Sequence, residues 1–159
     1  MTQSNVHEYF QKDHKRLDEL FKSFQELKHS DPIKAKEAFK EFKFGLQRHI
    51  VWEEDVLFPA WEHGSGFPEG GPTHVMRLEH RQIGECLEAL HAKVQECDPR
   101  SDTEEQQLLR LLGAHNLKEE RILYPAIEAL LEDEEQASLF KAMEAIPRER
   151  YETGCGRHR

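Results

Sequence analysis

The hydrophobic positions of this chain recur at steps of three and four residues in several long segments. This spacing is typical of amphipathic α-helices, whose apolar side chains lie along one face. No segment shows the strict alternation of apolar and polar residues that indicates a half-buried strand. The pattern predicts four long helices and a short fifth helix, over residues 6–28, 32–62, 72–96, 102–131 and 133–145.

Residues that start or stop helices separate these segments. Asp31 precedes Pro32, which places an N-cap residue before a proline in the first helical turn. Residues 63–72 are rich in glycine and proline, and we expect them to form the loop that joins the two halves of the chain. Pro59 and Pro125 lie inside two of the predicted helices. A proline there removes a backbone hydrogen bond, so we expect each to kink or end its helix.

Short connections between the long helices predict an all-α, up-down-up-down four-helix bundle. The bundle and the short fifth helix together form one predicted domain, residues 1–146. Residues 147–159 are polar and contain two glycines, and we expect them to form a mobile tail.

A sequence motif occurs twice in the chain, 66 residues apart. Residues 49–62 and 115–128 share the pattern H-x-x-x-E-E-x-x-L-(F/Y)-P-A-x-E. The same shift aligns Asp13-His14 with Glu79-His80. Each half of the chain therefore offers a lone histidine followed by a His-x3-Glu pair, and such a repeat of chemically active residues is a strong functional signal.

The histidines and glutamates of this repeat lie on the apolar faces of their predicted helices. Residues four apart on a helix point in nearly the same direction, so each histidine faces its glutamate. A carboxylate on the inward face must be paired or bind a metal, because burying a bare charge costs several kcal/mol or more. We therefore predict that six residues converge on metal ions inside the bundle: His14, His49, Glu53, His80, His115 and Glu119.

Other interpretations of these residues carry less weight. Most His-x3-Glu pairs are solvated pairs on a helix surface, but both pairs here follow apolar stripes. Glu54 and Glu120 point about 100° away from the predicted ligands, which leaves them behind the ligands or in solvent. Imidazole and carboxylate donors suit iron, manganese or zinc, and carboxylates from two helices favour a dinuclear site.

Composition excludes several classes of protein. The formal net charge of −9 disfavours nonspecific nucleic-acid binding. No run of 18 apolar residues occurs, so no membrane span is expected, and the polar first residues lack the apolar region of a signal peptide. The expected location is the cytoplasm. The three cysteines do not form a C-x-x-C motif, and Cys155 is expected to be an exposed free thiol.

The paired motifs resemble those of the hemerythrin-like, or HHE cation-binding, domain family, over most of the chain. The resemblance implies a non-haem di-iron centre with terminal histidines, two bridging carboxylates and an oxo or hydroxo bridge. Members of the family are linked to dioxygen binding, sensing of oxygen or iron, nitric-oxide response and iron–sulfur repair. The protein partner remains open.

One departure from the oxygen carriers bears on function. Those proteins have a fifth histidine in an H-x-x-x-H motif, but Met76 stands four residues before His80 here. His74 lies about 120° away from His80 around the helix, so it reaches the metals only if the helix starts late or is distorted. We therefore expect a position open to an external ligand.

Four functions fit such a centre. The first is a protein that binds or senses O2, NO or redox state. The second is a di-iron oxidase, peroxidase or nitric-oxide-detoxifying enzyme. The third is an iron donor in iron–sulfur cluster repair, and the fourth is a bundle in which the metal only stabilises the fold. Whether the protein is an enzyme stays open.

Overall fold

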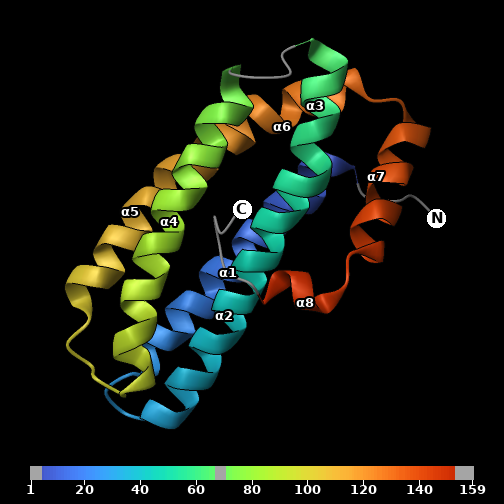
Figure 1. The fold of residues 1–159 in the computed structure, drawn as a ribbon. Coiled ribbons are helices and arrows are strands. Elements are labelled where there is room, and N and C mark those ends of the chain that lie inside the picture. The colour runs from blue at the N-terminus through green and yellow to red at the C-terminus, as the bar shows by residue number, and fades with distance from the viewer. Residues whose placement is uncertain (1–4, 67–70, 153–159) are drawn as a thin grey trace.

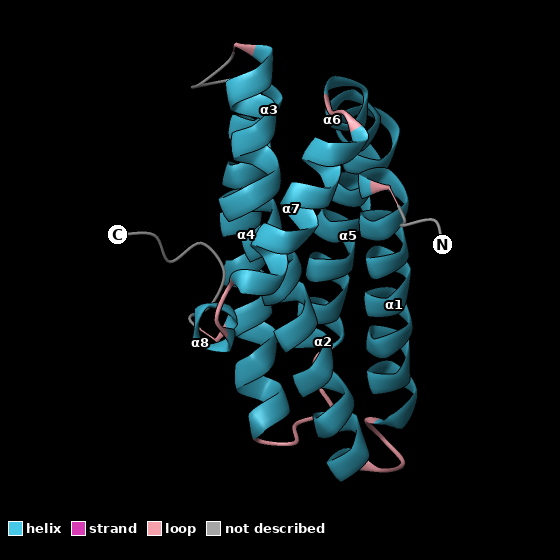
Figure 2. Cartoon of the chain, turned by 90° about the vertical axis from the view of Figure 1, so that its right-hand side faces the viewer, coloured by secondary structure: helices cyan, strands magenta, loops and turns pink. Residues whose placement is uncertain are grey.

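Four long helices form a bundle in the computed structural model, which describes residues 5–66 and 71–152 (Figure 1). The four are α1 (Val6–Leu27), α2 (Pro32–Trp52), α4 (Gly71–Gln95) and α5 (Asp102–Lys118). Shorter elements extend or flank them: η1 (Glu53–Leu57), α3 (Phe58–Ser65), η2 (Glu119–Leu123), α6 (Tyr124–Leu130), α7 (Asp133–Ala145) and α8 (Arg148–Tyr151). The described residues form no strand, as Figure 2 also shows, and the prediction of an all-α bundle is confirmed.

The helix ends lie close to the positions that the cap residues indicate. The Asn5 side chain accepts a hydrogen bond from the backbone N–H of Glu8, and Asp31 does the same for Lys34. Glu132 and Glu135 form a capping box at the start of α7. Gly66 ends α3 with a φ of 80°, a left-handed conformation that glycine adopts without steric cost.

Two apolar clusters fill the interior, one on each side of a polar layer. The first cluster includes Phe10 on α1 and Trp52 on α2, and the second includes Leu17 and Leu46 on the same two helices. His14 lies between Phe10 and Leu17 along α1, so the predicted ligands separate the two clusters. No helix among the described residues has the length and apolar character that crossing a membrane requires.

The proline-containing segments depart from regular α-helix geometry. Neither Pro59 nor Pro125 ends its helix; instead a five-residue π-helical segment, η1 or η2, precedes each and the α-helix then resumes. Phe58 donates its backbone N–H to the Glu53 carbonyl, and Tyr124 donates to Glu119, five residues back in each case. Proline has no backbone N–H, and the first turn of an α-helix does not require one. The wide π turn therefore accommodates each proline at the start of the resumed α-helix.

The start of the predicted mobile tail is ordered, so that prediction is wrong for residues 148–151. These residues form α8, and Tyr151 is buried against α2. The Trp52 indole N–H donates to the Tyr151 hydroxyl at 2.8 Å, and the Gln47 side-chain amide donates to the Tyr151 carbonyl at 2.6 Å. One aromatic ring with two hydrogen-bonded polar groups is enough to dock this short helix. Residues 153–159, which include Cys155, lie outside the described residues.

Replacing Tyr151 with phenylalanine is expected to lower the free energy of unfolding by about 1–2 kcal/mol. The change leaves the buried Trp52 N–H without its acceptor, and an unpaired buried donor carries this cost. Urea denaturation followed by fluorescence measures the effect. Tyr9→Phe is the control, because the Tyr9 hydroxyl has no hydrogen bond to any other described residue. Equal losses in the two variants would contradict a specific role for the Tyr151 hydroxyl.

Candidate metal centre

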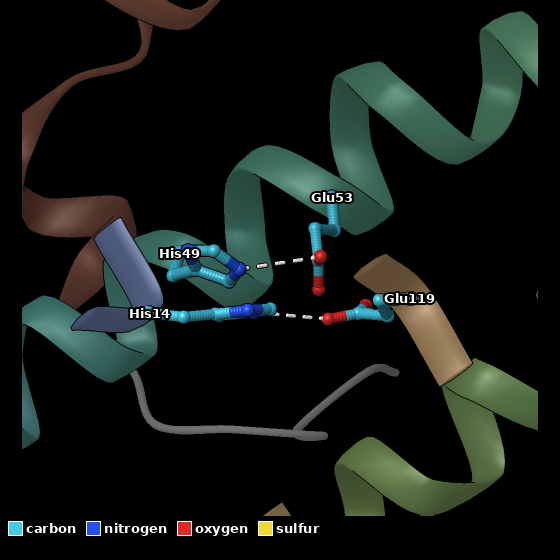
Figure 3. Close-up of side chains that lie close together, drawn as sticks. All are labelled: His14, His49, Glu53 and Glu119. Carbon is cyan, nitrogen blue, oxygen red and sulfur yellow. Dashed lines mark ion pairs between the residues drawn. The ribbon is translucent and has the colours of Figure 1, made fainter. Parts of the chain in front are cut away.

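The six residues singled out in the repeat come together as two groups of four in the middle of the bundle. One group contains His14, His49, Glu53 and Glu119, and the other contains Glu53, His80, His115 and Glu119. Within each group the candidate ligand atoms all lie within 4.8 Å of one another. Figure 3 shows the first group, with the two histidine rings and the two carboxylates directed at a common region. We call the first group site A and the second group site B.

Glu53 and Glu119 each present one carboxylate oxygen to each site. At site A, His49 Nε2 lies 3.2 Å from Glu53 Oε2, and His14 Nε2 lies 3.1 Å from Glu119 Oε1. At site B, the other oxygen of Glu53 lies 3.0 Å from His80 Nε2, and the other oxygen of Glu119 lies 3.1 Å from His115 Nε2. This arrangement is the one that a pair of bridging carboxylates needs.

The donor atoms of site B are buried but not satisfied by hydrogen bonds. All six side chains are between 0% and 4% exposed. Within residues 5–66 and 71–152, Glu53 Oε1, Glu119 Oε2 and His80 Nε2 have no hydrogen-bond partner, although His80 Nε2 and Glu53 Oε1 are close in space. Buried polar atoms are rarely left without a partner, so these residues fit a bound cation.

Every candidate ligand histidine is oriented by a carboxylate from a different helix. The four Nδ1-to-carboxylate distances lie between 2.7 and 2.9 Å, and the pairs are His14 with Glu120, His49 with Asp13, His80 with Glu54, and His115 with Glu79. These pairs connect α1 to α2, η1 to α4, α4 to α5, and η2 to α1. The result is a closed ring around the bundle, which we call the carboxylate ring.

The carboxylate ring determines which histidine nitrogen is free. When the Nδ1–H group donates a hydrogen bond to a carboxylate, the proton stays on Nδ1. The lone pair on Nε2 is then available to bind a metal. Glu54 and Glu120 therefore contact the outer nitrogens of His80 and His14, on the side away from the two sites. Asp13 and Glu79 have the same role, which the sequence analysis did not assign to them, although both directly precede a ligand histidine in the sequence.

Comparison with known proteins identifies the family. The model of the hemerythrin HHE cation-binding domain matches residues 5–127, which cover the whole bundle and both sites. This chain belongs to the hemerythrin HHE cation-binding family. No solved structure matches it closely enough to add to this assignment.

Relatives of this hemerythrin-family chain carry several names. It is 37% identical to the iron–sulfur cluster repair protein YtfE of Yersinia pseudotuberculosis, over 34% of this chain and 24% of that protein. It is 28% identical to a probable iron–sulfur cluster repair protein of Haemophilus influenzae, over 45% of this chain and 32% of the relative. A Nostoc protein named DNA nickase is 28% identical over 96% of this chain and 43% of the relative. The chain thus spans less than half the length of these relatives.

The charges of this hemerythrin-family centre are balanced by protons in the metal-free protein. Burial lowers the pKa of His49, but the Glu53 and Asp13 carboxylates outweigh burial and raise that pKa to about 10. In the same way Glu53 and Glu54 overcome burial and raise the pKa of His80 to about 9. Burial alone would raise the pKa of Glu53, but His49 and His80 hold it well below its usual range. Metal binding must therefore release protons from the histidines.

The metal-free protein is expected to lose stability as the pH rises from about 6.5 toward 10. His49 holds its proton more tightly in the folded state, so this contribution is complete below the unfolded pKa and is lost as the pH passes the folded pKa near 10. The free energy of unfolding should fall by about 1.4 kcal/mol per pH unit for each such proton. Urea denaturation of chelated protein across this window measures the slope. The metal-loaded protein is the control, and equal slopes for the two forms would contradict the expectation.

Tyr124 is a residue of the centre that the sequence analysis missed. Its hydroxyl donates to Glu53 at 2.5 Å and to Glu119 at 2.9 Å, and it contacts both histidines of site A. In the metal-free protein, burial and the Glu119 and Glu53 carboxylates raise the pKa of Tyr124 well above 10. In an α-helix, a residue five positions past Glu119 would point about 140° away from it. The π turn brings the two onto one face, and Pro125 was the available signal.

His74 does not reach the centre. Its side chain is exposed near the start of α4, and it belongs to neither site. Helix α4 starts at Gly71, before His74, so the late start that would bring this residue to the metals does not occur. Met76, in the position of the carriers' fifth histidine, is buried in the first apolar cluster. The described cysteines, Cys86 and Cys97, are free and outside both sites.

Proposed function

We propose that this chain holds two iron ions in a non-haem centre and uses them to bind or sense a small molecule such as O2 or NO. The ligands are His14, His49, Glu53, His80, His115 and Glu119. The observation that carries the proposal is the double use of Glu53 and Glu119, each with one oxygen directed to each site.

The donor set and the relatives both favour iron. Two imidazoles and two shared carboxylates at each site match the ligands that iron, manganese and zinc accept, without a thiolate that would select a softer ion. The family is a cation-binding one, and two of the relatives are named for iron–sulfur cluster repair. Manganese or zinc could occupy the same ligands in vitro.

The residues around the site orient the histidine ligands and limit the access of water to the metals. The carboxylate ring keeps each Nε2 lone pair directed inward and accepts the histidine Nδ1–H. Aromatic rings of the first apolar cluster pack on two of the histidines. Phe10 packs edge-on against His49, and Phe58 stacks on His80. Bound iron supplies a redox-active Lewis acid to this apolar enclosure. An apolar diatomic molecule enters such an enclosure more readily than water does.

A second candidate function is iron donation to damaged iron–sulfur clusters. The names of the Yersinia and Haemophilus relatives favour it, although this chain covers only 24% and 32% of those proteins. A donor must release iron to an acceptor, whereas a sensor retains iron while its external ligand exchanges. The two functions therefore differ in a measurable way.

Anaerobic reconstitution with ferrous iron tests the proposal. We expect two irons per chain, and we expect azide on the diferric form and NO on the diferrous form to change the optical or EPR spectrum. His115→Ala should lose iron, whereas His91→Ala, outside both sites, should keep two. Iron content near one, or iron unaffected by His115→Ala, would overturn the assignment. Transfer of iron to an apo iron–sulfur protein would favour the donor, and multiple turnovers with O2, peroxide or NO would favour an enzyme.

A further inference from the structure

One difference between the two halves of the repeat places an oxygen atom beside the metal sites in one half alone. Phe58 and Tyr124 occupy equivalent places, each five residues past a bridging glutamate. The Phe58 ring stacks on His80 with centroids 5.7 Å apart, and the Tyr124 ring lies 5.7 Å from the equivalent His14. Each ring thus lies beside the lone histidine of one site, stacked at 11° for Phe58 and tilted by 32° for Tyr124, but only the tyrosine carries an oxygen.

The Tyr124 oxygen has the spacing of a fifth ligand at site A. In an octahedral complex with metal–ligand bonds near 2.1 Å, adjacent ligand atoms are about 3 Å apart. The Tyr124 oxygen lies at such distances from all four donor atoms of the site: 3.2 Å from His14 Nε2, 3.1 Å from His49 Nε2, 2.5 Å from Glu53 Oε2 and 2.9 Å from Glu119 Oε1. The Tyr124 oxygen therefore lies 2.5 to 3.2 Å from each of the four donor atoms, which is the range expected for a fifth ligand beside them.

Among the residues that the structure describes, no equivalent oxygen contacts the donor atoms of site B. Three of its four donor atoms, on Glu53, Glu119 and His80, have no hydrogen-bond partner, whereas the corresponding atoms of site A contact the Tyr124 hydroxyl. The residue in the place of Tyr124 is Phe58, whose ring offers a hydrophobic surface and no donor atom. An external molecule that binds at site B meets this ring rather than a competing ligand.

We propose that Tyr124 is a fifth protein ligand of the site A metal, and that the site B metal, beside Phe58, is the one that takes the external ligand. The proposal rests on the proposed di-iron function and makes its two metals inequivalent. The phenol gives up its proton on binding ferric iron, as metal ligands in general do. The exchange of phenylalanine for tyrosine between two otherwise equivalent places thus directs small molecules to one metal.

Tyr124→Phe and the matched Phe58→Tyr test the proposal on diferric protein. Phenolate bound to ferric iron absorbs visible light, and excitation in that band enhances tyrosine ring vibrations in resonance Raman spectra. We expect these vibrations in the wild type, their loss in Tyr124→Phe and their increase in Phe58→Tyr. Azide titration should count one azide per chain in the wild type, two in Tyr124→Phe and none in Phe58→Tyr.

The outcomes separate this inference from the proposed function. A wild-type protein that binds two irons but shows no phenolate vibrations would overturn the ligand role of Tyr124. An unchanged azide count in both variants, each with two irons, would overturn the inequivalence of the sites. Failure of the wild type to take up two irons would instead overturn the proposed function, and this inference with it. Should Tyr124→Phe not fold, Phe58→Tyr supplies the same test in the opposite direction.

Discussion

Chelation of the metals is expected to lower the midpoint of thermal unfolding by on the order of 20 °C. A ligand that binds only the folded state stabilises it by about 4 kcal/mol when its free concentration is 1,000 times the dissociation constant, and two metals double this figure. Each kcal/mol shifts the midpoint of a domain of this size by about 2–4 °C. The six candidate ligands come from separate segments of the chain, so the unfolded state has no preformed site and binds metal weakly by comparison.

Calorimetry on metal-loaded and chelated protein measures this shift, with metal content determined on both samples. The His49→Ala, His115→Ala double variant is the control, because a chelator should barely move its midpoint. Identical midpoints for loaded protein and for protein shown to be metal-free would contradict the expectation, and would leave the metal without a role in stability.

Glu53→Gln should reduce the bound iron from two per chain to less than one. Glu53 is one of the two residues that present an oxygen to each site, near His49 at site A and near His80 at site B. An amide has the same shape but offers only one oxygen, and its NH2 group would face a cation. One substitution therefore weakens both sites together. Iron content after anaerobic reconstitution, with circular dichroism to confirm the fold, measures the effect.

Glu54→Gln is the matched control for this prediction. Glu54 is the next residue, is also buried, and contacts the outer nitrogen of His80 rather than the region of the metals. Loss of such an orienting carboxylate typically weakens metal binding about 10- to 100-fold, so two irons should still bind at saturating concentration. Equal losses in the two variants would show that burial of charge, rather than bridging, determines metal content.

The arrangement of the ligands was predictable because it follows from helical periodicity. His49 and Glu53 are one turn apart on α2 and η1, and the repeat placed a second such pair at His115 and Glu119. The apolar residues around them showed that both pairs face inward. These observations predicted the bundle, and they predicted the six residues that the structure brings together, without any knowledge of how the helices cross.

The features that were missed depend on departures from that periodicity or on contacts between distant residues. Tyr124 faces the centre because of a π turn, which rotates everything after Glu119 relative to a regular α-helix. Helix α8 is held by Tyr151, which is buried and hydrogen-bonds to Trp52 and Gln47, two residues far away in the sequence. The partner of His14 in the carboxylate ring, Glu120, belongs to the other half of the chain. Single-sequence periodicity carries none of this information.

The closed carboxylate ring makes the centre an interface between two helical hairpins. Asp13 orients His49 within the first hairpin, but His14 and His80 each depend on a glutamate from the opposite hairpin. Neither half could assemble a complete site alone, although two copies of one ancestral hairpin could have done so as a dimer. In the present chain, bound metals would hold the two hairpins together. A backbone cut between Gly66 and Gly71 should leave two fragments that stay associated while loaded and separate on chelation.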